Sequence, residues 1–331
     1  MITPRSMRAG VFLSAGILIA TPATAQKLRR AVAAADLVVV AEVRGSVSTQ
    51  AHRIHDLRVL EVLRGPANLP GIERVGVLES KRVAAHNKPV QGTVMLVSLH
   101  AFDAAASNTE LPRDRGPYFT MSGHPGSAVV LDEAVEDDPR LAFTRVLISS
   151  QNGQSSRQTA EQLYEIALEG DSRVRLEAAE SLSERPALGE LLTTVHLSNL
   201  LGRATAETED IQYKIALATI CAERKVEAVI PTLCLSVQHV GDEGFLRALG
   251  RFARFIHEEE AAQALLPQIQ RATGTTKERL IVALGATSTE GALEALLQMH
   301  RSGANKIAVE AALRAHGSPR ATAAIIKKNR E

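Results

Sequence analysis

The sequence predicts an α+β chain of two domains, a small antiparallel β-barrel followed by an α-solenoid of about five helical hairpins. Two observations predict this fold class. Between residues 34 and 131, short runs rich in β-branched residues alternate with glycine and proline. From about residue 170 onward, five apolar doublets recur at spacings of 38, 36, 31 and 29 residues, which is typical of stacked helical hairpins.

The first 25 residues have the three parts of a secretory signal peptide. Arg5 and Arg8 form a basic region, Ala9 to Ala20 is an apolar run of 12 residues, and Ala23 to Ala25 fits an A-x-A cleavage site. The apolar run is too short to span the ~30 Å hydrocarbon core of a bilayer. We therefore expect residues 1–25 to be removed and the mature chain to be periplasmic or extracellular.

A β-barrel domain is predicted over residues 27–150. Glycine and proline punctuate its apolar runs, and short helices are expected at its two ends, from Lys27 to Ala35 and from Pro139 to Ile148. The polar residues 151–156 are expected to form a linker to the second domain, residues 157–331. The six predicted strands are 36–43, 57–63, 75–78, 93–99, 118–121 and 128–131.

The second predicted strand ends with Glu61 to Pro66, and Gly92 to Val97 begins a hairpin. With these features, the order of the strands resembles the OB-like barrel of the netrin/TIMP-like class. That class is found in exported proteins, and its animal members are held by disulfides, including one from a cysteine at the mature N-terminus. The β segment here contains no cysteine. The inhibitor activity of the class is therefore not carried over to this chain.

Each predicted hairpin consists of an amphipathic first helix and a second helix marked by an apolar doublet. Thr275 with Glu278 and Thr287 with Glu290 fit the capping-box pattern of a helix start, and Ser318 before Pro319 fits a cap followed by proline. The doublets are Leu191-Leu192, Val229-Ile230, Leu265-Leu266, Leu296-Leu297 and Ile325-Ile326, and the first helices lie at 174–182, 211–221, 245–252, 280–284 and 307–313.

The first unit, Asp171 to Leu182, resembles the helix-opening pattern of HEAT-like repeats. In that pattern an aspartate precedes a valine-arginine pair, here Val174-Arg175, and an alanine pair, here Ala178-Ala179. The resemblance implies a scaffold or a surface that docks partner proteins.

Composition argues against nucleic acid as the partner. The chain has 38 basic and 37 acidic residues, aromatic residues make up 3 % and tryptophan is absent. A nucleic-acid binder usually has a basic excess and aromatic platforms for stacking.

Catalytic and metal-binding patterns are weak in this sequence. His52 and His55 are three residues apart on a predicted strand, so their side chains are expected to face opposite sides. His86, His100 and His124 have no carboxylate at helical ligand spacing. Ser122 to Ser127 lacks the G-x-S-x-G elbow and is predicted to be a turn. We predict no catalytic residue, no metal ligand and no cofactor.

Cys221 and Cys234 leave two interpretations open. An even number of cysteines in an exported chain favours a disulfide. Their places in the two helices of one hairpin imply an axial offset of about 10 Å, whereas a disulfide requires Cα atoms within ~7 Å. The alternative is two buried thiols.

We therefore expect an exported interaction or scaffold protein that docks a partner protein on its helical repeats. The alternatives are a metal-dependent or other hydrolase with its site in the β domain, and an envelope structural protein without a fixed ligand. Polar residues that follow the doublets are expected to face away from the core, because each residue turns a helix by about 100°. The predicted partner-binding residues are His196, Gln238, Gln270, Arg271, His300 and Arg301.

Overall fold

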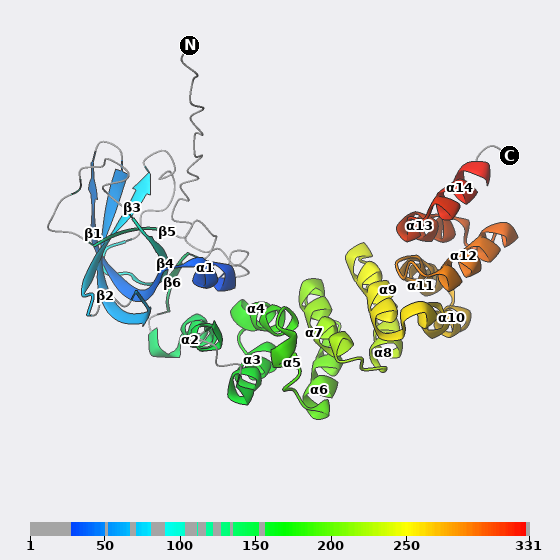
Figure 1. Cartoon of the computed structure of the whole chain (residues 1–331), viewed down its shortest axis with the longest axis horizontal. Coiled ribbons are helices and arrows are strands. Elements are labelled where there is room, and N and C mark those ends of the chain that lie inside the picture. Colours follow the sequence, from blue (N-terminus) through cyan, green and yellow to red (C-terminus); the bar gives the residue numbers. More distant parts are fainter. Residues whose placement is uncertain are drawn as a thin grey trace, which may run out of the picture. The chain divides into compact units, whose positions relative to one another are not determined.

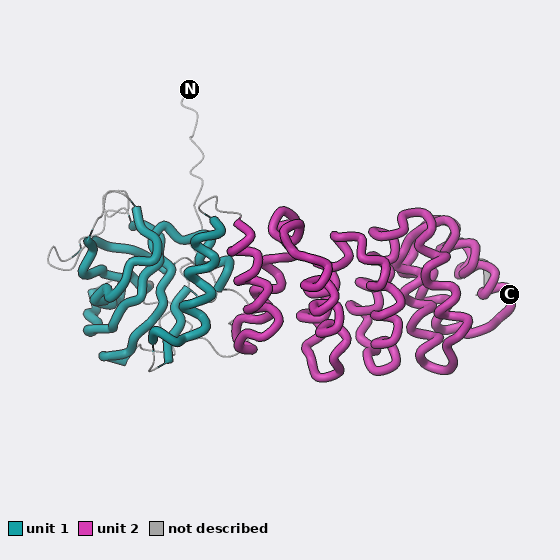
Figure 2. Tube along the Cα trace, turned by 90° about the horizontal axis from the view of Figure 1, so that it is seen from below, with its two compact units in different colours: residues 1–154 teal, residues 155–331 magenta. Residues whose placement is uncertain are grey.

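Six strands form the sheet of the first unit in this computed structural model, which describes residues 28–49, 52–66, 71–80, 90–102, 111, 117–121, 127–132, 135–151 and 156–328. The chain divides into two units, Met1–Gln154 and Ser155–Glu331 (Figures 1 and 2). The division falls inside the predicted linker. The signal-peptide prediction, His86, His124 and residues 122–126 lie outside the described residues.

All six predicted strands are present. They are β1 (Leu37–Ser48), β2 (His52–Arg64), β3 (Arg74–Ser80), β4 (Val94–Ala101), β5 (Tyr118–Met121) and β6 (Ala128–Val130). The order is β1-β2-β3-β5-β4-β6, and a further pairing of β1 with β4 closes the first five strands into a barrel. Because β6 pairs with β4 at Met95 to Val97 and β5 pairs with it at Leu99 to Ala101, the two short strands share one edge of β4.

One pairing corrects the antiparallel prediction. β3 and β5 are parallel, with Val77 opposite Phe119, while the other four pairings of the ring are antiparallel. A closed ring with an odd number of strands cannot alternate direction at every contact, so one neighbouring pair must run parallel. The barrel is therefore mixed, and its strand order and single parallel pair are those of an OB-like barrel.

Alternate residues of β1 build the barrel core. Leu37, Val39, Ala41 and Val43 point inward and pack with residues such as Phe119. Three register shifts between β1 and β2 mark irregularities that bend the strand. That bend lets β1 pair with β2 along most of its length and with β4 through its first half.

Two helices close the first unit, α1 (Leu28–Ala34) and α2 (Pro139–Gln151), and they pack against each other. Arg64 at the end of β2 donates to the carbonyl oxygens of Val32 and Ala35 and, at 2.6 Å, to Oε1 of Gln151. Arg64 thus ties the C-terminal end of α1, the last residue of α2 and β2 together.

The second unit is a stack of helices (Figure 1). Four of the five predicted hairpins are confirmed, namely α7 with α8, α9 with α10, α11 with α12, and α13 with α14. Their bounds, with the preceding helices, are α3 (Arg157–Glu169), α4 (Ser172–Ser183), α5 (Pro186–Gly189), α6 (Thr194–Ala204), α7 (Ile211–Glu223), α8 (Val229–Ser236), α9 (Glu243–His257), α10 (Ala261–Arg271), α11 (Gly274–Gly285), α12 (Glu290–Ser302), α13 (Lys306–His316) and α14 (Pro319–Lys328).

The first of the five predicted hairpins, at the start of the second unit, differs from the prediction. Leu191 and Leu192 lie in the turn between α5 and α6, so the second helix of this hairpin is α6 and not a helix around the doublet. Pro186 begins the short helix α5, and Thr193 then caps α6. An additional helix, α3, packs against α4 and was not predicted.

An aspartate is the N-cap residue of three helices, each of which is the first helix of a hairpin. Asp171 caps α4 and Asp242 caps α9, each accepting a hydrogen bond from a backbone N–H of the first turn, and Asp210 accepts two such bonds at the start of α7. Ser318 caps α14 as predicted, with its Oγ accepting from the backbone N–H of Ala321.

The two predicted capping boxes are wrong. Thr275 lies inside α11, whose N-cap is Thr273, and Thr289 rather than Thr287 caps α12. The hydroxyl of Thr287 instead donates to the carbonyl oxygen of Leu284, at the end of the preceding helix.

Glycines allow the first helices to pack closely. A Cβ atom on Gly250 of α9 would lie 2.2 Å from the carbonyl oxygen of Ala283 in α11. A Cβ atom on Gly285 of α11 would lie 2.2 Å from the carbonyl oxygen of Ala312 in α13. The helices α9, α11 and α13 therefore form a row held at backbone-to-backbone contact.

Candidate functional site

The predicted partner-binding residues do not share one environment. Gln238, Gln270, Arg271 and Arg301 are exposed. His300 is only 6 % exposed within α12, so the expectation that it faces away from the core is wrong. His300 lies four residues after Leu296, which is about one turn of the helix. Its side chain is therefore on the same buried face as Leu296.

His196 is half-buried and has a structural role. It forms a capping box with Thr193 at the start of α6, and its ring centroid lies 4.4 Å from that of Tyr164. None of the six predicted residues lines either of the two hollows described below.

Cys221 and Cys234 are both free and buried. The thiol of Cys221 donates to the carbonyl oxygen of Leu197 at 3.3 Å. Burial raises the pKa of both thiols to about 12, which keeps them protonated and unreactive. The structure therefore agrees with the second interpretation, in which Cys221 and Cys234 are two buried thiols and not a disulfide.

His55 is the centre of a buried polar network in the barrel. Its Nδ1 atom lies 2.7 Å from Oγ of Ser46 on β1, and its Nε2 atom lies 3.0 Å from Oε2 of Glu79 on β3. His55 and Glu79 are buried at 1 % and 5 % exposure, whereas Ser46 is exposed. The sequence gives no signal for this trio, because the three residues meet only through strand register.

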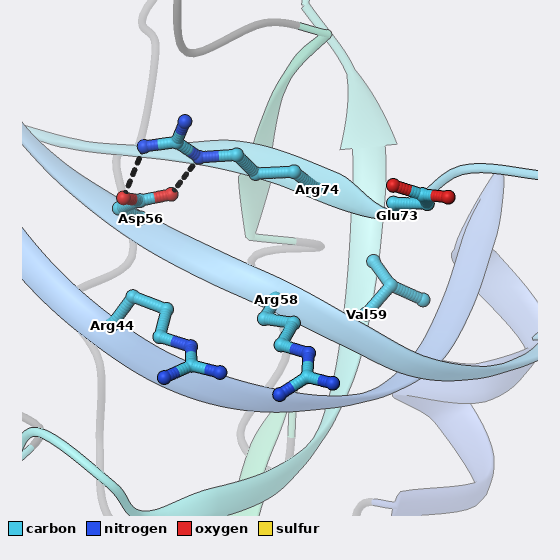
Figure 3. Close-up of a pocket in the computed structure, with 6 residues that line it drawn as sticks. All are labelled: Arg44, Asp56, Arg58, Val59, Glu73 and Arg74. Atoms are coloured by element: carbon cyan, nitrogen blue, oxygen red, sulfur yellow. Dashed lines mark hydrogen bonds and ion pairs between the residues drawn. The ribbon is translucent and has the colours of Figure 1, made fainter.

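A first hollow, of about 610 Å³, lies on the barrel over β1, β2 and β3 (Figure 3). Asp56 and Arg74 form a two-bond ion pair in it, with both N–O distances 2.5 Å. Figure 3 shows Arg44 and Arg58 extending side by side from β1 and β2, and each also approaches Glu42, at 3.2 and 3.8 Å. The lining has three arginines and two carboxylates, Asp56 and Glu73, and Glu42 beside it supplies a third carboxylate.

A second hollow, of about 690 Å³, lies on the helical unit. We call it the arginine hollow, because its charged lining consists of Arg247, Arg251 and Arg254 of α9 and Arg314 of α13. The rest of its lining is uncharged and includes the turn from Ala286 to Ser288 after α11.

An exposed aromatic side chain lies beside the arginine hollow. Phe255 is 50 % exposed and follows Arg251 by four residues on α9, so the two lie on neighbouring turns of the same helix face. Aromatic residues and arginine are enriched in the buried centres of protein interfaces. The α9 surface therefore combines an apolar anchor with positive charge.

Within the described ranges, no group of three or more histidine, cysteine, aspartate or glutamate side chains is arranged to hold a metal ion. Among the same residues, every helix is too short or too polar to cross a membrane. Comparison of the chain with protein-family models, with curated proteins and with solved structures finds no match.

Proposed function

We propose that the protein is an exported interaction protein whose HEAT-like helical unit docks a partner protein. One observation carries the proposal, namely the half-exposed ring of Phe255 next to a hollow with four arginines and no acidic side chain in its lining. A large apolar side chain in water costs free energy that burial against a partner recovers. The row of close-packed helices supplies a rigid platform for such an anchor.

A photo-crosslinking experiment in cells tests the docking surface. The full chain is produced with the photoreactive residue benzoylphenylalanine at position 255, and in a matched control at position 235, where Leu235 of α8 is 65 % exposed. We expect a discrete crosslinked protein from position 255 and none from position 235. Adducts of equal yield at both positions, or none at 255, would refute docking on α9.

The proposal includes export, which rests on the signal-peptide pattern of residues 1–25. N-terminal sequencing of protein recovered from the cell envelope or the medium tests it. We expect Gln26 as the first residue. Recovery of the chain in the cytosol with Met1 retained would contradict export.

The network at His55 supports a second candidate, a hydrolase site in the barrel. A serine hydroxyl in contact with an imidazole that a carboxylate orients is the arrangement of an activated nucleophile. A fluorophosphonate probe, with the Ser46→Ala variant as control, tests this candidate. Labelling of Ser46 that disappears in the variant would favour it, and absence of labelling would leave the network as a structural one.

A further inference from the structure

We propose that the arginine hollow binds an acidic segment of the docked protein, a stretch of peptide with at least two carboxylate side chains. This inference rests on the proposed docking function and names the chemistry of the partner. It follows from the number of arginines, from the state of each guanidinium group and from the absence of acidic residues in the lining.

The arrangement of the arginines is unfavourable without a ligand. Arg247 and Arg251 are four residues apart, and Arg254 follows three residues later, so three positive charges share one face of α9. Like charges at this spacing destabilise a helix. Arg314 adds a fourth charge from α13.

The carboxylates within this part of the chain are too few to neutralise the cluster. Arg247 pairs with Glu243 at 2.5 Å and Arg314 pairs with Glu310 at 3.4 Å, each within one helix. The arginine side chains of these pairs are 57 % and 63 % exposed, and such surface pairs are weak. Arg251 makes no hydrogen bond or ion pair with any residue in the described ranges.

Arg254 is held in position by the backbone. Its Nη1 atom donates to the carbonyl oxygens of Thr287 and Ser288, at 3.3 and 3.0 Å. Both bonds use one nitrogen, so the rest of the guanidinium group remains available for a carboxylate, which arginine binds through two parallel hydrogen bonds. A fixed guanidinium group beside the unpaired Arg251 thus forms a receptor for acidic side chains.

A peptide fits this surface better than a nucleic acid. The hollow is small, and the chain as a whole has a net charge of +1, without the basic excess that is typical of a nucleic-acid binder. The exposed ring of Phe255 at its edge suits an apolar side chain next to the acidic ones.

Fluorescence anisotropy with a defined probe tests the inference. The probe is a labelled peptide of four glutamates and one leucine, and the control peptide has glutamine in place of glutamate. The Arg251→Glu/Arg314→Glu variant of the full mature chain is compared with Arg271→Glu/Arg301→Glu, which changes two exposed arginines outside the hollow and alters the net charge equally.

We expect the first variant to weaken probe binding by at least about tenfold and the second by less than about threefold. Equal losses in both variants, tighter binding of the glutamine peptide, or stronger binding of a single-stranded oligonucleotide would each overturn the inference. If the crosslink at position 255 persists while the probe fails to bind, docking stands and the acidic chemistry is wrong. If both fail, the docking proposal itself falls.

Discussion

His55 and Glu79 form a buried contact between neighbouring strands, with Nε2 of His55 3.0 Å from Oε2 of Glu79. Arg53 also approaches Glu79, at 3.7 Å. A buried carboxylate is stable only where such partners replace its hydration. Glu79 therefore holds polar side chains of two neighbouring strands, β2 and β3, together.

We expect Glu79→Ala to lower the free energy of unfolding by about 1–3 kcal/mol, because the variant leaves His55 without its buried acceptor. Urea unfolding followed by circular dichroism measures the change. Glu73→Ala, at an exposed position six residues before Glu79 in the sequence, is the control and is expected to change stability by less than about 0.5 kcal/mol. Equal effects of the two substitutions would contradict the role of Glu79.

The close contacts at Gly250 and Gly285 predict that neither position accepts a side chain. Alanine at either place would press its Cβ atom against a carbonyl oxygen at 2.2 Å, and we expect a loss of about 1–3 kcal/mol. Gly202 in α6 has no atom within 4 Å of an added Cβ, so Gly202→Ala is expected to stabilise the helix by about 0.5–1 kcal/mol. Thermal melts of the three variants check the contrast, and a uniform shift would disprove it.

We expect the ionisation of Asp138 to make the free energy of unfolding depend on pH. Burial raises the pKa of its carboxyl group, but hydrogen bonds from the Arg140 side chain and from the backbone N–H groups of Asp132 and Arg140 outweigh that effect and leave the pKa below its usual value of 3.8. Because the folded-state pKa is lowered, the ionised group stabilises the fold above the unfolded-state pKa. That contribution is lost as the pH falls through the folded-state value.

We therefore expect Asp138→Asn to be less stable than the unmodified chain at pH 7, with the difference shrinking as the pH falls below about 4. Asparagine still caps α2, so the variant removes mainly the charge. The exposed Asp137→Asn variant is the control. Denaturant titrations over a pH series measure the effect, and a difference that is constant with pH would contradict it.

Because Cys221 and Cys234 are buried, we expect their thiols to be unreactive in the folded chain. With each pKa raised to about 12, neither thiol should react with Ellman's reagent at pH 8 in the folded chain. Both should react after unfolding without a reductant. Because the unfolded thiols ionise near 9, stability should also fall as the pH rises from about 9 toward 12. No reaction after unfolding would indicate a disulfide instead.

The elements that sequence alone predicted are those with a repeated local signal. The apolar runs of the six strands and the paired helices from Ile211 onward carry periodicity that short windows reveal. The first hairpin was misplaced because Leu191 and Leu192 are apolar within a turn, where their burial comes from packing that no local pattern records.

The candidate sites depend on contacts between distant residues. Arg314 meets the arginines of α9 only because α9, α11 and α13 stack at a spacing that Gly250 and Gly285 set. Ser46, His55 and Glu79 meet only through the register of three strands. The doublets mark the second helices, so the partner surface was predicted there, whereas the arginine hollow lies on the first helices α9 and α13.

The position of Arg64 has a mechanical consequence. Arg64 donates a hydrogen bond to Gln151, which lies three residues before the boundary at Gln154. The same guanidinium group also donates to the carbonyl oxygen of Ala35, just after α1. Tension applied to the chain through that boundary would enter the first unit at α2 and reach β2 through two contacts, the hydrogen bond from Arg64 to Gln151 and the ion pair between Arg145 and Glu61 at 2.8 Å. The end of α2 is thus anchored to β2 at two points, and a pulling force on the chain would be divided between them.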